Sequence, residues 1–118
     1  MKESIVQTKS FKFSLKIIDL YKELEGENEY IISKQILRSG TSIGANIEEA
    51  LAGQSRRDFI SKMAISSKEA RETKYWLRLL KESNITSINV DGLIEDIFEL
   101  IRMLTSIVKT SQQNLTKH

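Results

Sequence analysis

The hydrophobic positions of this chain recur with the period of an α-helix in four separate segments. In the first segment, from about residue 10 to residue 24, apolar residues follow one another at spacings of four and three: Phe13, Ile17, Leu20 and Leu24. This spacing places them on one face of a helix. Phe11, Leu15 and Ile18 are expected to widen that core-facing stripe. Gly26 is expected to end the helix in the left-handed conformation.

The second helix is predicted from about residue 29 to residue 52, and the third from about residue 56 to residue 82. The third carries a heptad seam with small residues in its middle: Phe59, Met63, Ser66, Ala70, Thr73, Leu77 and Leu80. Between the two helices, Gly53 suits the position just past a helix end, and Ser55 with Asp58 resembles a capping box. A tight turn is therefore expected to join two antiparallel helices.

The fourth helix is predicted to begin near Val90 or Asp91, with one apolar stripe: Ile94, Ile97, Ile101, Leu104, Val108 and Ser111. Acids fill its first half, and Arg102 and Lys109 follow in its second half, as the helix dipole favours. No stretch alternates with period two. We predict one all-α domain over residues 1–118, an antiparallel up-down-up-down four-helix bundle whose ends fray at about residues 1–8 and 112–118.

The stretch RSGTSIGANIEEA, residues 38–50, contains two glycines four residues apart. A phosphate-binding loop would need a preceding strand and a lysine after its last glycine, and neither is present. Apolar residues at helical spacing continue straight through the stretch, so we predict a continuous helix. Gly40 and Gly44 would then lie one turn apart and admit a second helix at close range. That helix could belong to this chain or to another copy.

Composition agrees with helices and narrows the chemistry. The chain has 118 residues, no proline and no cysteine, with 40% hydrophobic and 29% charged residues. Charges interrupt its N-terminal segment, so we expect no signal peptide, no membrane association and a cytoplasmic location. The only histidine is the last residue, His118, which leaves no Glu-x-x-His pair for a di-iron site and no base for a nucleophilic triad. We therefore predict no catalytic residue, cofactor or metal.

Basic residues concentrate on the third helix, which holds eight of the 18 Lys and Arg residues against four acids. Most fall within an arc of roughly 140°: Arg56, Arg57, Lys68, Arg71, Lys74, Arg78 and Lys81. One interpretation is a solvated face. The other is a surface for phosphate backbones, with Tyr75 as a stacking ring. Ile60 and Ala64 interrupt the arc, which would limit that surface to the second half of the helix.

Two further side-chain groups leave alternatives open. Ile65, Trp76 and Leu79 form a second apolar arc, either covered by the fourth helix or used for self-association. Four glutamates on the second and third helices are expected to pair with Arg38, Arg71 or Lys74: Glu48, Glu49, Glu69 and Glu72.

The joined motifs QILRSGTSIGANIEEA (35–50) and SRRDFISKMAISSKEARETKYWLRLL (55–80) resemble the four-helix bundle proteins encoded in intervening sequences of bacterial 23S rRNA genes, once labelled S23 ribosomal-like. The accessory variability protein of diversity-generating retroelements is a relative. The resemblance covers about residues 9–109. It implies a homopentameric ring with a basic central channel, a nucleic-acid ligand and no enzymatic activity. For the retroelement relative it also implies a reverse transcriptase as partner.

At matching positions, the resemblance makes Arg71, Lys74, Arg78 and Lys81 candidates for nucleic-acid binding. It makes Gly40, Gly44 and Trp76 candidates for packing within or between subunits, and we add Ile65 from the second apolar arc. The leading hypothesis is a non-enzymatic homo-oligomer that binds structured RNA or DNA through the basic arc. The alternative is an adaptor that docks a partner protein on its spare apolar face.

Overall fold

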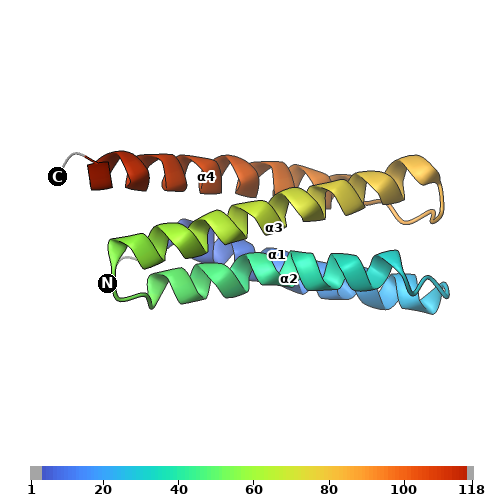
Figure 1. The fold of residues 1–118 in the computed structure, drawn as a ribbon. Helices are drawn as coiled ribbons and strands as arrows, with labels where there is room; N and C mark the ends of the chain where they lie inside the picture. The colour runs from blue at the N-terminus through green and yellow to red at the C-terminus, as the bar shows by residue number, and fades with distance from the viewer. Residues whose placement is uncertain (1–3, 117–118) are drawn as a thin grey trace.

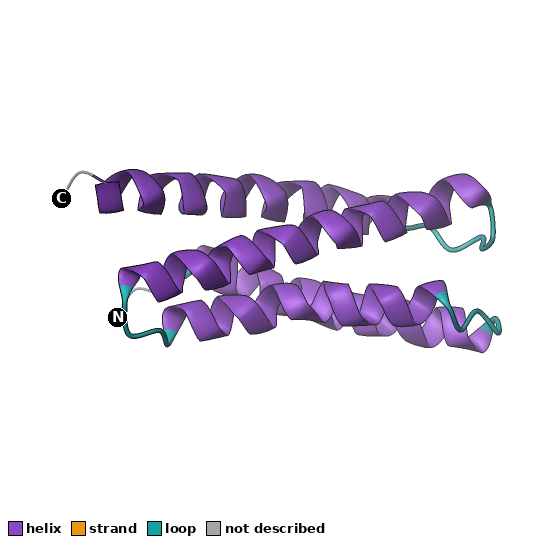
Figure 2. Ribbon diagram, viewed as in Figure 1, coloured by secondary structure: helices purple, strands orange, loops and turns teal. Residues whose placement is uncertain are grey.

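A computed structural model describes residues 4–116, which fold into four antiparallel helices: α1 (Ile5–Gly26), α2 (Ile32–Leu51), α3 (Arg56–Ser83) and α4 (Asp91–Thr116). The described residues contain helices and loops and no strand (Figure 2). The α1–α2 and α3–α4 loops lie at one end of the bundle, and the α2–α3 turn lies at the other (Figure 1). The molecule measures 52 × 24 × 22 Å. The predicted up-down-up-down bundle is confirmed.

The first and last helices, α1 and α4, extend further toward the chain ends than the sequence pattern predicted. Residues 5–8 and 112–116, which were expected to fray, are helical, while residues 1–3 and 117–118 lie outside the described residues. The backbone N–H of Gln7 donates to Ser4 Oγ at 3.2 Å, so Ser4 caps α1. The spacing of Ser4 and Gln7 fits a capping box, a signal that could have located this start.

All four helices bury their apolar stripes in one core. Its largest fully buried apolar side chains come from every helix: Ile17, Leu24, Ile36, Ile43, Ile47, Met63, Leu77, Leu80, Ile97, Leu100 and Leu104. Phe11 and Leu15 do not join them, since they are 62% and 51% exposed, so the expected widening of the α1 stripe is wrong for these two, whereas Ile18 is half-buried. These two side chains lie on the side of α1 that faces away from the core. Phe59, predicted in the α3 seam, is only half-buried.

The two glycines of the RSGTSIGANIEEA stretch face α1 of the same chain. A Cβ atom at Gly40 would stand 2.9 Å from both Cγ1 and Cγ2 of Ile17, which is closer than side chains tolerate. A Cβ atom at Gly44 would stand 3.5 Å from the hydroxyl oxygens of Ser10 and Ser14, an ordinary contact. Of the two origins left open for the approaching helix, the structure shows α1, and Gly40 is where the approach is tightest.

Small polar residues allow α2 and α3 to pack closely in the middle of the bundle. The Ser66 hydroxyl donates to the Ile43 carbonyl oxygen at 2.8 Å, and the hydroxyls of Thr73 and Ser39 are hydrogen-bonded at 2.9 Å. Ser39, Ser66 and Thr73 are completely buried. Their hydrogen bonds offset the cost of removing these hydroxyls from water. The small residues in the predicted seam therefore mark the contact between α2 and α3.

The chain reverses direction with asparagine rather than glycine in the left-handed conformation. Asn28 has φ 64° and Asn84 has φ 56°, whereas no described glycine has positive φ, so the left-handed role expected for Gly26 is wrong. Gly53 instead occupies a tight position, because a Cβ there would overlap the end of the Asp58 side chain and stand 3.1 Å from the Ala50 carbonyl oxygen. Ser55 Oγ accepts from the Asp58 N–H at 3.0 Å, as the predicted cap requires.

α1 packs mainly on α2, and α4 packs mainly on α3, whereas α1 and α4 have little contact with each other. Two ion pairs between partly exposed side chains cross from α1 to α4: Lys9 with Glu99 at 3.1 Å and Lys16 with Asp96 at 2.9 Å. Exposed pairs of this kind contribute at most about 1 kcal/mol each. Strong packing in the bundle therefore joins helices that are neighbours in the chain.

Candidate nucleic-acid interface

Three of the four basic residues predicted to bind nucleic acid reach toward α4. Arg71 Nη2 donates to Thr105 Oγ1 at 3.3 Å, and Lys74 Nζ lies 5.2 Å from the centre of the Phe98 ring. Lys81 Nζ lies 2.8 Å from a carboxylate oxygen of Asp91 at the start of α4. The basic arc of α3 therefore borders α4 along much of its length.

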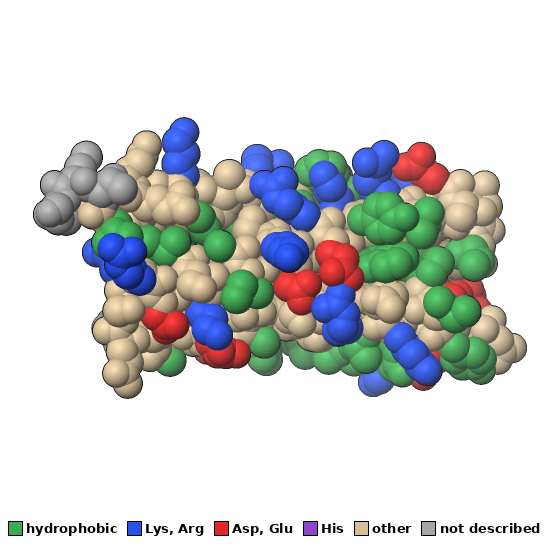
Figure 3. Space-filling model, viewed as in Figure 1, with side chains coloured by type: hydrophobic (Ala, Val, Ile, Leu, Met, Phe, Trp, Pro, Cys, Tyr) green, Lys and Arg blue, Asp and Glu red, His purple; other side chains and the backbone are tan. Residues whose placement is uncertain are grey.

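α4 adds two exposed cations to this side of the molecule. Arg102 lies between Phe98 and Thr105 at helical spacings of four and three, so it occupies the same side of α4 as the partners of Lys74 and Arg71. Lys109 and Arg71 line one shallow depression between the two helices. We call Arg71, Lys74, Arg102 and Lys109 the α3–α4 basic face. Lys and Arg side chains gather over these helices in Figure 3.

None of these four cations forms an ion pair with another residue of the described range. Arg78 and Lys81 differ, since Arg78 lies 3.5 Å from Glu82 and Lys81 pairs with Asp91. The hydrogen bond to Asp91 raises the pKa of Lys81. Acids thus compensate the last turns of α3. The cations of the α3–α4 basic face, which have no acidic partners among residues 4–116, therefore lie in the middle of the bundle, and Lys109 extends them away from the α3–α4 loop. They are not confined to the second half of α3, where the sequence pattern placed them.

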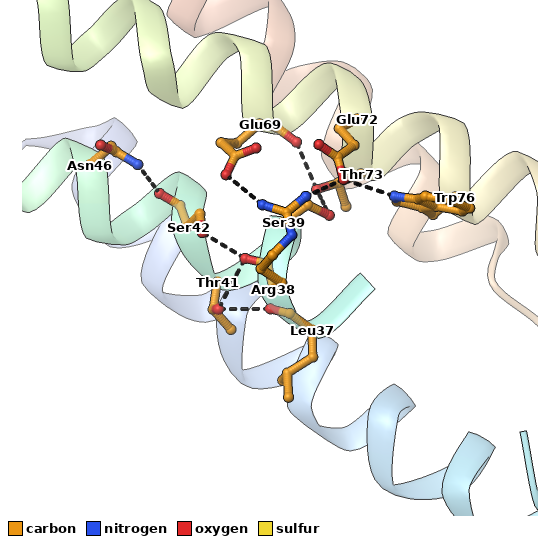
Figure 4. A network of polar contacts seen from close by, with 10 residues as sticks. All are labelled: Leu37, Arg38, Ser39, Thr41, Ser42, Asn46, Glu69, Glu72, Thr73 and Trp76. Carbon is orange, nitrogen blue, oxygen red and sulfur yellow. Dashed lines mark hydrogen bonds and ion pairs between the residues drawn. The ribbon is translucent and has the colours of Figure 1, made fainter. Parts of the chain in front are cut away.

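On the opposite side of α3, Arg38 of α2 lies between two carboxylates (Figure 4). Its Nη1 lies 3.1 Å from Glu69 Oε2, and its Nη2 donates to Glu72 Oε2. Trp76 Nε1 donates to the same Glu72 oxygen at 3.0 Å. The hydrogen bond from Trp76, together with Arg38, lowers the pKa of Glu72. This cluster joins α2 to α3 and fixes the indole.

The expected pairing of glutamates is correct for Arg38 and wrong for Arg71 and Lys74. Glu69 and Glu72 both pair with Arg38. Glu49 pairs with Lys62 at 3.1 Å, and Glu48 accepts hydrogen bonds from the Gln7 amide. Because the acids of α2 and α3 are used in these contacts, they leave the α3–α4 basic face uncompensated.

We expect Glu72→Gln to remove part of the acid sensitivity of the fold. Folding lowers the pKa of Glu72, so its contribution is complete above the ordinary value of 4.5 and is lost as the pH falls below it. The partly exposed group contributes at most about 1 kcal/mol. Urea titrations at about pH 7 and about pH 3 should show a larger stability difference between variant and wild type at the higher pH, because the contribution declines as the pH falls from 4.5 toward the lowered pKa of Glu72. A difference that does not shrink at the lower pH would contradict this assignment. Glu82→Gln, at the more exposed pair with Arg78, is the control.

The residues predicted for helix packing or a subunit interface divide into two groups. Gly40 and Gly44 contact α1 within the chain. Trp76 is half-buried against the core, and Ile65 is 41% exposed. With Leu79, Ile65 leaves part of the second apolar arc of α3 at the surface.

Other site types gain no support within residues 4–116. No group of three or more His, Asp or Glu side chains is placed to hold a metal ion, and His118 lies outside these residues. No helix among them combines the length and the apolar character that crossing a membrane requires.

The fold and this surface define a small all-helical bundle protein with a basic face shared by two adjacent helices. The chain belongs to the family of 23S rRNA-intervening sequence proteins, whose pattern matches residues 2–106. It is also similar to the crystal structure of a protein of unknown function from the S23 ribosomal protein family of Bacteroides thetaiotaomicron. The two share 50% identity and a TM-score of 0.84, over 89% of this chain and 99% of that one. No curated protein matches.

Proposed function

We propose that this protein is a non-enzymatic, homo-oligomeric bundle that binds nucleic acid through the α3–α4 basic face. The observation that carries the proposal is the placement of Arg71, Lys74, Arg102 and Lys109 on one surface without acidic partners among the described residues. Cations in this arrangement replace the counterions of a phosphate backbone, which favours binding through counterion release. Four glutamates of α2 and α3 take part in other contacts and do not oppose it: Glu48, Glu49, Glu69 and Glu72.

Assembly of several copies would raise the affinity for nucleic acid above that of one bundle. Four phosphate contacts on one bundle give only modest affinity at physiological salt. Several copies that present the same face to one strand would bind with a much higher effective affinity. Exposed apolar side chains on α1, Phe11 and Leu15, offer surface that contacts between copies could bury. We propose a ring of five subunits, as the family resemblance implied, with a cytoplasmic location.

The salt dependence of binding by the unmodified protein tests this proposal. The logarithm of the association constant should fall linearly with the logarithm of salt concentration, with a slope of about −3 for each engaged bundle on a single strand. Fluorescence anisotropy with labelled RNA and DNA measures this slope, and sedimentation measures the native mass. Affinity that does not change with salt, or no binding at all, would refute the proposal.

The exposed apolar surface supports a second candidate, an adaptor that docks a partner protein. Ile65 is 41% and Leu79 36% exposed, and both lie on the second apolar arc of α3. A monomeric mass combined with no affinity for nucleic acid would favour this adaptor over the first proposal.

A further inference from the structure

We infer that the nucleic acid bound by the α3–α4 basic face is single-stranded, with unstacked bases against the rings of Tyr75 and Phe98. This inference rests on the proposed function and specifies its ligand. Tyr75 is 58% exposed and Phe98 is 41% exposed, although both are large apolar rings. Neither ring is part of the buried core.

The two rings stand among the cations of the basic face. The Lys74 ammonium lies 5.2 Å from the centre of the Phe98 ring, and Tyr75 is the next residue along α3. Arg102 follows Phe98 by four residues and so lies one turn further along the same side of α4. A strand whose phosphates contact Arg71 and Arg102 would therefore bring its bases within reach of both rings.

A hollow of about 230 Å³ opens beside Tyr75, lined by Tyr75, Arg78, Leu79 and Glu82. The Glu82 carboxylate would repel a phosphate, and it already pairs with Arg78 at 3.5 Å. A base has no such charge, and its flat face suits the apolar surfaces of Tyr75 and Leu79. The hollow therefore favours a base, while the backbone follows the cations nearer Arg71.

A ring contact with Trp76 restricts the orientation of Tyr75. Its ring meets Trp76 edge to face, with centroids 5.1 Å apart and an angle of 73° between the planes. Trp76 in turn donates to Glu72, which Arg38 holds from α2. A ring held in this way loses little conformational freedom when a base stacks on it.

These features favour a single strand over a duplex. The bases of a duplex stack on one another, so a duplex would present phosphates to the exposed rings and gain nothing from them. Bases in a single strand have open faces, and aromatic side chains between cations bind such strands with little regard for sequence. The cations would bind either ligand, whereas stacking on the two rings would add affinity only for the single strand.

The test compares an unstructured single strand of about 20 nucleotides with the duplex of the same sequence, as RNA and as DNA. We expect the unmodified protein to bind the single strand about tenfold more tightly. Tyr75→Leu and Phe98→Leu should each lower single-strand affinity about tenfold, with an unchanged salt slope and unchanged duplex affinity. Tyr75→Trp should retain single-strand binding. Tyr30→Leu, which removes a 48% exposed ring from the α1–α2 loop, is the matched control.

The chain also supplies a direct optical signal. Trp76 is its only tryptophan and touches Tyr75, so stacking on Tyr75 should change its fluorescence, and Tyr75→Leu should abolish that change. Equal affinity for duplex and single strand would overturn the inference and leave salt-dependent binding intact. Unchanged single-strand binding by a variant that combines Tyr75→Leu with Phe98→Leu would do the same. Failure to bind either ligand would refute the inference and the proposed function together.

Discussion

The triple variant Arg71→Gln, Arg102→Gln and Lys109→Gln is expected to bind single-stranded nucleic acid about a hundredfold more weakly than the unmodified protein at about 0.1 M salt. The three side chains are exposed and form no ion pair with any residue from 4 to 116. Each lost phosphate contact should flatten the salt dependence by about 0.7, so the slope should fall by about 2. Near 1 M salt the two affinities should converge. Anisotropy titrations over a range of salt concentrations measure both quantities.

Two matched variants show whether position or total charge matters. Lys12→Gln, Lys22→Gln and Lys34→Gln together remove three exposed cations from α1 and α2, and should change the affinity by less than about threefold. Arg78→Gln with Lys81→Gln should also have a small effect, because Glu82 and Asp91 already compensate these charges. An equal loss of affinity in the α1–α2 variant would show that only net charge counts, and the proposed face would be wrong.

Alanine substitutions at the two glycines of α2 are expected to change stability in opposite directions. In a helix interior, alanine is more favourable than glycine by about 1 kcal/mol. At Gly44 the new methyl group would meet only ordinary contacts at 3.5 Å, so Gly44→Ala should stabilise the fold by about 0.5–1 kcal/mol. At Gly40 the methyl group would overlap the branched, fully buried side chain of Ile17 at 2.9 Å. Overpacking should outweigh the helix preference and leave Gly40→Ala about 1–2 kcal/mol less stable.

Urea unfolding followed by circular dichroism measures both effects. Ile17→Ala removes the atoms that Gly40→Ala would strike, so the double variant should be more stable than the sum of the single changes predicts, by at least about 1 kcal/mol. Stabilisation by Gly40→Ala equal to that by Gly44→Ala would show that α1 shifts without cost. Gly40 would then be dispensable for the contact between α1 and α2.

The helical period predicted the fold because the spacing of apolar residues within each helix determines which of them share the buried face. Ile17, Ile47 and Leu77 occupy stripes that repeat every three or four residues, and any bundle of these helices must bury them. Phe11 and Leu15 show the limit of this reasoning. They are apolar and at helical spacing, but they lie on the side of α1 that faces away from the core, where no helix among the described residues covers them.

Only half of the candidate site could be predicted from the sequence, because residues of two helices form it. The basic arc of α3 could be predicted from the spacing of its residues. The positions of Arg102 and Lys109 already fitted the dipole of their own helix, so the sequence did not indicate that they share a surface with α3. Only the alignment of α3 with α4, seen where Lys74 meets Phe98 and Arg71 meets Thr105, brings the two sets of cations together. The neutralisation of Lys81 by Asp91 likewise depends on how the α3–α4 loop folds back.

The sparse contact between α1 and α4 has a consequence for how the chain acquires its structure. Every extensive helix pair, α1 with α2, α2 with α3 and α3 with α4, closes a hairpin between segments that are adjacent in the chain. Such a topology has low contact order, which is typical of proteins that fold within microseconds to milliseconds. The chain also contains no proline, so no peptide-bond isomerisation delays any molecule. Each hairpin of the chain can therefore form without waiting for a contact between the two terminal helices.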